Sequence, residues 1–203
     1  MKAVVCTKLG KPNLLEIKDI DKPTINKDEV LIKVEVAGVN FPDALLVQGK
    51  YQIVIDPPFI PGNEVCGIIE EKGENVDIPL GTKVIGIPPI GGFAEFVTIN
   101  KNLVIPVSMN FDSLAGASLP INYGTSYYAL KRRANAQSGE SLLVLGASGG
   151  IGTATIQLAK VMGLKTICAV GSDNKEEYVK SLGADQIVRS VSYTHLRAHE
   201  TEA

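Results

Sequence analysis

The chain has 203 residues, a formal net charge of −2 at pH 7 and 45% hydrophobic residues, enough for one large or two small buried cores. No strong basic character is present, which argues against nucleic acid as the main partner. No apolar run reaches the roughly 20 residues of a membrane-spanning helix, and the N-terminus turns polar before a signal peptide could form. We therefore expect a cytoplasmic protein with neither a membrane nor a nucleic-acid partner.

The first half of the chain, to about residue 108, consists of short β-type segments separated by turn residues. Between residues 29 and 39 apolar and polar side chains alternate, which is typical of a half-buried strand. Many short strands with frequent Gly and Pro turns predict a barrel-like or sandwich-like domain. Further strands are expected at 2–7, 14–20, 65–71, 83–87, 93–99 and 103–106.

From residue 110 onward, helices alternate with short apolar strands. This alternation predicts a parallel sheet with right-handed crossovers. The fold class is therefore α/β plus β, with a β-rich domain at 1–118 followed by a partial doubly wound parallel sheet at 119–189. Helices are expected at 110–119, 121–134, 151–162 and 174–182, and buried strands at 142–145, 166–170 and 185–188.

A glycine-rich turn joins the strand at 142–145 to the helix at 151–162. Gly146 suits a sharp turn, Gly149 leaves room for a pyrophosphate, and Gly152 permits close packing of the helix on the strand. The amides at the helix N-terminus attract an anion. Glycine loops that bind nothing also occur, so the rest of the chain must decide between these alternatives. The predicted dinucleotide contacts are Gly146, Ala147, Ser148, Gly149, Gly150, Ile151 and Gly152.

The run from Gly139 to Lys160 resembles the signature of the quinone oxidoreductase and zeta-crystallin family, which belongs to the medium-chain dehydrogenases/reductases. Segments 37–43, 61–67 and 122–128 also resemble that family, and the likeness extends to about Val188. The resemblance implies a GroES-like catalytic domain followed by a Rossmann domain. It also implies a small quinone or enone acceptor, and a homodimer for the complete family enzyme.

Two asparagines distinguish the chain from the zinc-dependent relatives of this family. In those alcohol dehydrogenases, a cysteine stands at the position of Asn40 and a histidine at the position of Asn63. A catalytic zinc needs three ligands among Cys, His and carboxylates, and Glu64 alone does not suffice. We therefore expect a zinc-independent enzyme without a metal site. In this interpretation Glu64 is structural, and His195 and His199 are not ligands.

The end of the second parallel strand bears on the choice of cofactor. An NAD-preferring site usually has an acid there, about 20 residues past the first glycine, whereas this strand runs into Gly171 and Ser172. Ser172 can donate to a 2′-phosphate and Lys175 supplies positive charge. Family members similarly use Gly-Ser and this lysine, while a tyrosine of some relatives is replaced by Ser190. We expect NADPH rather than NADH, and we interpret the nearby Asp173 as a helix N-cap.

The resemblance also implies where the acceptor binds. Asn40 and Tyr51 resemble positions that line the acceptor side of the nicotinamide, and Thr125 resembles one that touches the nicotinamide. Asn40 and Tyr51 are therefore the candidate catalytic residues, with a turn asparagine and a half-buried tyrosine as the alternatives. We expect hydride transfer to a quinone or an enone. An enoyl-type or acryloyl-type double-bond reductase and a non-catalytic dinucleotide-binding protein stay open.

The last residues, 190–203, show neither a clear period nor turn signals, and they resemble an adapter-derived ending rather than family sequence. A dinucleotide-binding domain of this type has about six parallel strands, and the chain reaches the third. We therefore expect a C-terminally truncated chain with a non-native tail. The alternatives are a native extension and, for function, an inactive dinucleotide-binding fragment.

Overall fold

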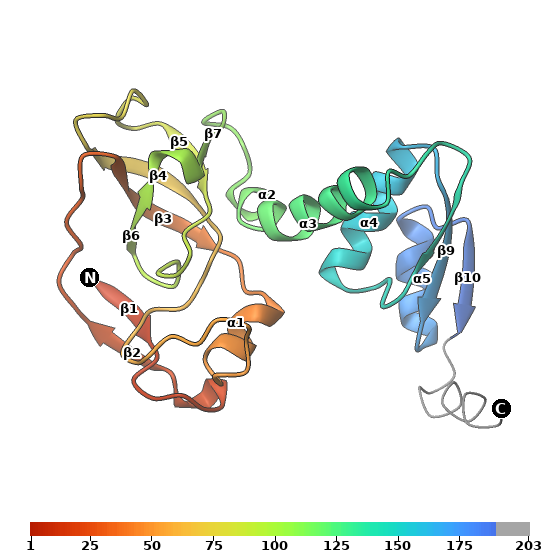
Figure 1. The fold of residues 1–203 in the computed structure, drawn as a ribbon, viewed down its shortest axis with the longest axis horizontal. Helices are drawn as coiled ribbons and strands as arrows, with labels where there is room; N and C mark the ends of the chain where they lie inside the picture. The colour runs from red at the N-terminus through yellow and green to blue at the C-terminus, as the bar shows by residue number, and fades with distance from the viewer. Residues whose placement is uncertain (190–203) are drawn as a thin grey trace. The chain divides into compact units, whose positions relative to one another are not determined.

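A computed structural model describes residues 1–189 of the chain, which divides into two compact units. The first unit runs from Met1 to Pro120 and the second begins at Ile121 (Figure 1). The first contains antiparallel strands and the second parallel strands. The tail expected at 190–203, which includes His195 and His199, lies outside the described residues.

An antiparallel sheet with the strand order β6-β3-β4-β5-β7 forms the centre of the first unit (Figure 1). The strand predicted within residues 29–39 is confirmed, but the predicted half-buried alternation is wrong at its start, where Leu31 is as fully buried as Val30 and Ile32. A separate pair of antiparallel strands is formed by β1 (Lys2–Val5) and β2 (Glu16–Asp19). The strands of the larger sheet are β3 (Glu29–Ala37), β4 (Val65–Lys72), β5 (Lys83–Gly86), β6 (Phe96–Asn100) and β7 (Val104–Pro106).

Valine and isoleucine side chains from this sheet build the core of the first unit. Branched side chains suit such a site because they pack well on a pleated surface. A smaller cluster joins Cys66 and Ile85 to Ala117, which follows α2 (Ser113–Gly116). Gly116 makes this approach possible, since a Cβ there would lie 2.7 Å from the sulfur of Cys66. The core cluster comprises Val30, Ile32, Val65, Ile69, Val76, Val84, Val97, Ile99 and Val104.

The helix predicted at 110–119 is much shorter in the structure, where it is confined to α2. The carboxylate of Asp112 accepts the backbone amide of Leu114 at 3.1 Å and so fixes the start of the helix. The segment before it stays non-helical for that reason. Single turns of 3₁₀ helix occupy Pro12–Leu14 and Lys101–Leu103.

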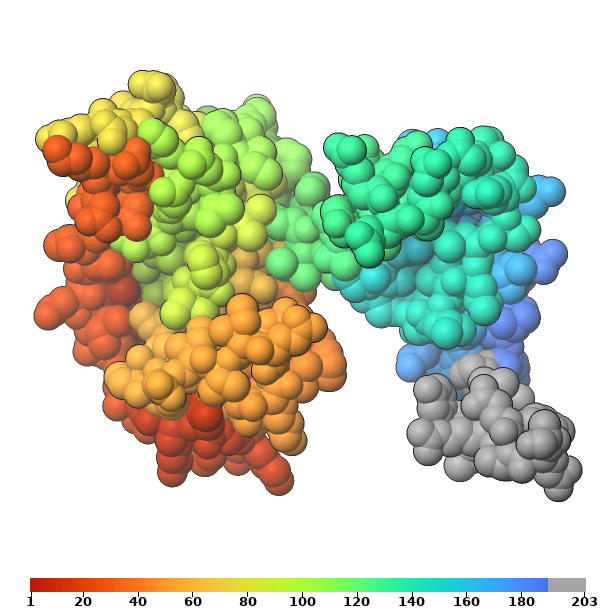
Figure 2. Space-filling model, in the orientation of Figure 1, coloured from red at the N-terminus to blue at the C-terminus, as the bar shows by residue number. Residues whose placement is uncertain are grey.

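Helix α1 (Phe41–Leu46) was not predicted from the sequence, although it has a start signal. The backbone amide of Asn40 donates to the carboxylate of Asp43 at 2.8 Å, which is half of a capping box. Leu46 and Val47, at the end of the helix, are buried in a cluster of their own. The segment that follows α1 lies on the surface of the first unit (orange in Figure 2).

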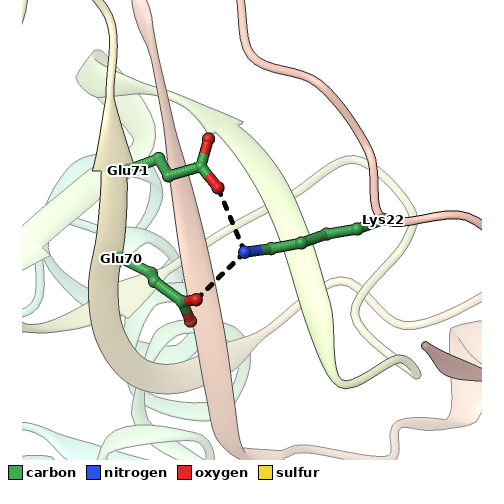
Figure 3. A network of polar contacts seen from close by, with 3 residues as sticks. All are labelled: Lys22, Glu70 and Glu71. Atoms are coloured by element: carbon green, nitrogen blue, oxygen red, sulfur yellow. Dashed lines mark hydrogen bonds and ion pairs between the residues drawn. The ribbon is translucent and has the colours of Figure 1, made fainter.

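Lys22 connects the loop before β3 to the sheet (Figure 3). Its ammonium group lies 3.0 Å from a carboxylate oxygen of Glu70, 3.0 Å from one of Glu71 and 4.5 Å from the centroid of the Phe96 ring. Neighbouring strand residues normally point to opposite faces, but the pairing of β3 with β4 skips Glu70. This β-bulge lets both carboxylates reach one lysine, and they raise the pKa of its ammonium group.

The second unit contains a parallel sheet with the strand order β10-β9-β8 (Figure 1). Its strands are β8 (Ser141–Val144), β9 (Lys165–Val170) and β10 (Gln186–Arg189). Helices α4 (Gly150–Val161) and α5 (Asp173–Ser181) connect them. The predicted order of a β-rich domain followed by a parallel α/β sheet is therefore confirmed.

A helical segment precedes β8 and covers residues 120–133. The prediction of a helix at 121–134 is confirmed, although part of the segment has the wider turns of a π-helix. Leu130 is buried in a cluster with α4 and the loop after it. The successive stretches are Pro120–Gly124 with π geometry, Thr125–Tyr127 (α3) with α geometry and Tyr128–Arg133 with π geometry.

The core of the second unit lies between the sheet and the helices α4 and α5. On β8, Val144 faces these helices and is 6% exposed, whereas Leu143 on the same strand and Leu145 just after it are 57% and 75% exposed. The prediction of a strand buried on both faces is wrong for β8 within residues 1–189. The reason is that α4 and α5 cover the same face of the sheet. The core cluster comprises Val144, Ala147, Ile156, Cys168, Val170 and Val179.

Candidate functional site

The glycine-rich loop lies between β8 and α4 in the second unit. Gly146 has a φ angle of +63°, in the left-handed region that favours glycine. A Cβ on Gly152 would lie 2.5 Å from the carbonyl oxygen of Ala147, so only glycine permits this packing. Among the described residues, a Cβ on Gly149 would contact the Gly146 carbonyl oxygen alone, at 3.4 Å. The loop is thus tight on its protein side and open beside Gly149.

The first turn of α4 presents backbone amides that have no acceptor within the helix. Gly149 precedes the helix in extended backbone, and its carbonyl oxygen accepts the amide of Thr153 at 2.8 Å. Unpaired amides and the helix dipole favour an anion such as a phosphate at this end. Ala147 is fully buried, and it packs in the core cluster of the second unit.

Two hydroxyl groups that the sequence interpretation missed hold the start of α4 in place. Ser126 is 1% exposed, and its hydroxyl donates to the carbonyl oxygen of Ile151 at 3.2 Å. The hydroxyl of Thr155 donates in turn to Ser126 at 3.0 Å. Thr125, the predicted nicotinamide contact, is exposed and directly precedes Ser126. The sequence contains no signal for this network because its members lie on two different helices.

The predicted 2′-phosphate contacts follow β9. Within residues 1–189, no atom other than those of Gly171 and its two chain neighbours lies within 4 Å of the place where a Cβ on Gly171 would be. The hydroxyl of Ser172 donates to Oδ1 of Asn174 at 2.6 Å, so this donor is engaged within the chain. Ser172, and not Asp173, occupies the position before α5, so the predicted N-cap role of Asp173 is wrong. Lys175 is exposed at the start of the helix.

Arg189, at the end of β10, is a charged neighbour of this site that the sequence interpretation missed. It stands opposite Val170 in the strand register. Its guanidinium group forms an ion pair with Asp173 and a second one with Glu176 at 3.5 Å. Asp173, the acid beside the predicted phosphate contacts, therefore has a cationic partner in Arg189. Adjacent parallel strands end at the same edge of a sheet, and this rule is the signal that could have indicated Arg189.

In the first unit, Asn40 directly precedes α1 and is bound to a buried carboxylate. Its Nδ2 donates to Oε1 of Glu64 at 2.7 Å, and Glu64 is 1% exposed. The backbone carbonyl of Glu64 also accepts the amide of Gly38 at 3.0 Å. A Cβ on Gly38 would lie 2.3 Å from the same Oε1, so the carboxylate fits tightly against the backbone.

The groups around Asn40 do not suit a zinc ion. Catalytic zinc takes three protein ligands among Cys, His and carboxylates, whereas Asn40 and Asn63 supply amides beside Glu64. Cys66 is fully buried against Ile85, and burial raises the pKa of its thiol. In the part of the chain that the structure describes, no group of three His, Cys, Asp or Glu side chains could hold a metal ion.

A cavity of about 220 Å³ lies beside α1. Tyr51, one of the two predicted catalytic residues, lines this cavity, whereas Asn40 is not among its lining residues. The structure therefore assigns different surroundings to the two residues. The apolar part of the wall is formed by Pro42, Leu46, Ile53, Ile55, Pro89 and Ile90.

Two polar side chains, Asp43 and Asn63, also line the cavity, and the sequence interpretation assigned neither to a ligand. Asp43 is 5% exposed, and burial raises the pKa of its carboxyl group. Oδ1 of Asn63 is buried and has no hydrogen-bond partner among residues 1–189. A buried acceptor without a donor costs roughly 1–3 kcal/mol. The replacement of a zinc ligand by Asn63 is the sequence feature that could have indicated this position.

Comparison with known proteins supports the same two-part organisation. Residues 26–109 match the family described as alcohol dehydrogenase GroES-like domain, and residues 150–201 match the family described as zinc-binding dehydrogenase. The chain is 38% identical to quinone oxidoreductase-like protein 2 of Bos taurus, over 95% of this chain and 54% of that protein. It is 35% identical to the quinone oxidoreductase of Rattus norvegicus, over 100% of this chain and 63% of that protein.

A solved structure of similar sequence is the quinone oxidoreductase from Thermus thermophilus, whose complex with NADPH is also known. It is 36% identical, has a TM-score of 0.84, and is matched over 98% of this chain and 62% of that chain. The chain thus spans less than two thirds of these relatives. The GroES-like unit and the Rossmann-type sheet define a medium-chain dehydrogenase/reductase. Within that superfamily, the chain belongs to the quinone oxidoreductase family.

Proposed function

We propose that the whole protein is an NADPH-dependent oxidoreductase that transfers a hydride to a quinone or enone acceptor without zinc. The observation that carries the proposal is the conformation of the glycine loop before α4. Gly146 has a φ angle that favours glycine, and a side chain on Gly152 would collide with backbone. This loop occurs in a chain that is 35% and 38% identical to proteins named for quinone oxidoreduction.

The residues of the second unit suit a dinucleotide phosphate. The amides from Gly146 to Gly152 and the N-terminus of α4 hold the pyrophosphate in this proposal. Thr125 contacts the nicotinamide, which supplies the hydride when the cofactor is bound. Lys175 binds the 2′-phosphate together with Ser172, whose hydroxyl exchanges its present partner Asn174 for the phosphate. The NADPH complex of the Thermus relative supports this choice of cofactor.

The acceptor side of the proposal rests on the first unit. Tyr51 lines the apolar cavity beside α1, where its hydroxyl can donate to a developing oxyanion. Asn40 is the second orienting residue, with its Nδ2 bound to Glu64. Zinc independence is part of the proposal because Asn40 and Asn63 supply amides where a zinc site needs anionic or imidazole ligands.

The proposed substrate is a small molecule. The homodimer and the cytoplasmic location expected from the sequence belong to the same proposal. Within residues 1–189, none of the helices is long and apolar enough to cross a membrane. The mixed charge of the chain, with 20 basic and 22 acidic residues, argues against nucleic acid as the main partner.

Calorimetric titration of the 203-residue chain with NADPH and with NADH tests the cofactor. We expect tighter binding of NADPH, and we expect Lys175→Ala to weaken it about tenfold, since a hydrogen bond to a charged group contributes roughly 1.5–3 kcal/mol. NADH binding should stay unchanged in the same variant. Lys180→Ala, on the same helix, is the matched control. An equal loss for both cofactors would contradict the assignment of Lys175.

Turnover of NADPH with a panel of acceptors tests the reaction itself. The panel contains 1,4-benzoquinone, 9,10-phenanthrenequinone, an α,β-unsaturated ketone and an enoyl thioester, each assayed with and without a chelator. Reduction of a quinone or the enone that persists in the chelator supports the proposal. Reduction confined to acyl thioester enoyl substrates would identify a double-bond reductase of the other type. NADPH binding without turnover would indicate a non-catalytic protein, and inhibition by the chelator would contradict zinc independence.

A further inference from the structure

We propose that Asn122 is a further residue of the cofactor site, and that its side-chain amide donates a hydrogen bond to the pyrophosphate of a bound dinucleotide. Asn122 lies in the helical segment Pro120–Gly124, which directly precedes α3. The sequence interpretation gave this residue no part in binding. The inference rests on the proposed function in that it takes the glycine loop before α4 as the dinucleotide site.

The side-chain amide of Asn122 lies against the first residue of α4. Among the described residues outside the adjoining stretch of chain, the three atoms nearest to a Cβ placed on Gly150 are Oδ1, Cγ and Nδ2 of Asn122, at 2.6, 3.1 and 3.2 Å. A side chain at position 150 would therefore collide with this amide, and glycine permits the close approach. Gly150 is exposed and Asn122 is half-buried, so a ligand has access to the place where they meet.

Two hydrogen bonds fix the helical segment that carries Asn122 to α4. The hydroxyl of Tyr123, the next residue, donates to Oε1 of Gln157. The hydroxyl of Ser126, one turn further on, donates to the carbonyl oxygen of Ile151 at 3.2 Å. Both acceptors belong to α4, so Asn122 is held at a fixed place beside the N-terminus of this helix.

The electrostatics at the start of α4 favour an anion, and a neutral amide preserves them. Helix α4 has no acidic residue in its first turn and no side-chain cap, so its first amides stay available to a ligand. An asparagine beside this turn adds a donor without adding a negative charge that would compete with a phosphate. Its Nδ2 carries two hydrogens, of which one suffices for a phosphate oxygen.

The proposed course of the cofactor passes Asn122. In the proposed function the pyrophosphate lies at the glycine loop and the nicotinamide lies at Thr125. Asn122 contacts Gly150 of that loop and precedes Thr125 by about one helical turn. The amide is therefore placed beside the part of the dinucleotide that joins these two contacts, which begins with the pyrophosphate.

Calorimetric titration of the 203-residue chain with ADP-ribose tests this contact, because the probe contains the pyrophosphate and lacks the nicotinamide. Asn122→Ala removes the donor and should weaken binding about tenfold. Asn122→Asp should weaken it further, because a carboxylate repels the pyrophosphate. Asn122→Lys should bind at least as tightly as the wild type, because an ammonium group supplies both a donor and a positive charge.

Gln186 supplies matched controls for the change in charge. It is exposed at the start of β10, and parallel strands begin at the edge of the sheet away from the glycine loop, which follows the end of β8. Gln186→Glu and Gln186→Lys should therefore retain wild-type binding. Binding of 2′-AMP, which has the 2′-phosphate and no pyrophosphate, should be the same in the wild type and in the Asn122 variants.

Undiminished binding by Asn122→Lys beside weakened binding by Asn122→Asp cannot result from a damaged fold and would support the inference. Wild-type affinity of Asn122→Ala, an equal loss in Asn122→Lys and Asn122→Asp, a parallel loss of 2′-AMP binding, or no binding of ADP-ribose by the wild type would overturn it. If the variants behave as expected and the chain reduces no acceptor, the proposed function fails and this inference stands. If the chain reduces an acceptor and Asn122→Ala binds ADP-ribose normally, the inference fails and the proposed function stands.

Discussion

Asn40 and Glu64 form a hydrogen-bonded pair in which a neutral amide donates to a buried carboxylate. Nδ2 of Asn40 donates to Oε1 of Glu64 at 2.7 Å, and the carboxylate is almost completely buried. A buried carboxylate needs a donor or a cation to offset its lost hydration. The amide of Asn40 offsets part of the lost hydration of the Glu64 carboxylate without introducing a second charge.

The replacement of Asn40 tests this pairing. Asn40→Leu removes the donor, and we expect a loss of about 1.5–3 kcal/mol of unfolding free energy, the usual contribution of a hydrogen bond to a charged group. Asn40→Asp places a second carboxylate beside Glu64, so we expect a larger loss at neutral pH that diminishes as the pH falls and one carboxyl group takes up a proton. Urea denaturation near neutral pH and in mild acid measures both effects. Wild-type stability of Asn40→Asp at neutral pH would refute the pairing.

The second prediction concerns the close packing around Gly152. A Cβ there would lie 2.5 Å from the Ala147 carbonyl oxygen, and a backbone atom cannot yield as a flexible side chain can. We therefore expect Gly152→Ala to cost about 1–3 kcal/mol of stability, as overpacked sites do, and to weaken NADPH binding by displacing the start of α4.

Gly124→Ala is the matched control for this prediction. Gly124 has a helical φ of −60°, and among the described residues no atom outside the adjoining stretch of its own chain lies within 4 Å of the added Cβ. Alanine should stabilise the second unit there by about 0.5–1 kcal/mol. Thermal unfolding of the two variants compares them directly, and a similar loss in both would show that Gly152 is not sterically constrained.

Buried Ser126 provides the third prediction, which concerns the predicted cofactor site. Ser126→Ala removes the hydrogen bond to the Ile151 carbonyl and leaves the Thr155 hydroxyl without its present acceptor. We expect a loss of about 1–3 kcal/mol of stability and weaker NADPH binding, because the first turn of α4 is then held less firmly. Thermal unfolding and calorimetry of the same variant measure these effects. Unchanged NADPH affinity would show that the network has no influence on the loop.

The sequence predicted features that depend on local chemistry. The alternation around Val30 and Ile32 identified a strand because side chains point to alternate faces, whatever the partner strands are. The left-handed turn at Gly146 was expected for a similar reason, since few other residues adopt that conformation. The overall order of strands and helices follows from the same local periodicity.

Features that depend on distant parts of the chain were missed. The cavity around Asn63 is formed by residues from α1 and from loops that are far apart in sequence, so spacing gives no indication of it. The partner of Asp173 is Arg189, which belongs to the neighbouring strand. The exposure of Leu143 depends on which face of the sheet the helices cover, a property that hydrophobicity alone does not determine.

Two aspartates provide the last prediction, because their pKa values are shifted in opposite directions. Burial raises the pKa of Asp43 above its ordinary 3.8, although the Asn40 amide opposes the shift. The backbone amide and hydroxyl of Thr166, at 2.7 and 3.0 Å, lower the pKa of Asp185 below the same value. Asp43 therefore contributes stability that is fully present below pH 3.8 and is lost as the pH rises through its raised pKa. Asp185 contributes stability that is present above pH 3.8 and is lost as the pH falls through its lowered pKa.

The variants Asp43→Asn and Asp185→Asn separate the two contributions, because each amide removes one titration. Relative to Asp43→Asn, the wild type should lose stability as the pH rises from about 3 to about 7. Relative to Asp185→Asn, it should lose stability as the pH falls over the same interval. Urea midpoints across this range measure both differences, and the shared background of other carboxylates cancels in each comparison. Slopes of the same sign for the two variants would contradict the assignment, since burial and hydrogen bonding act on the charged form in opposite directions.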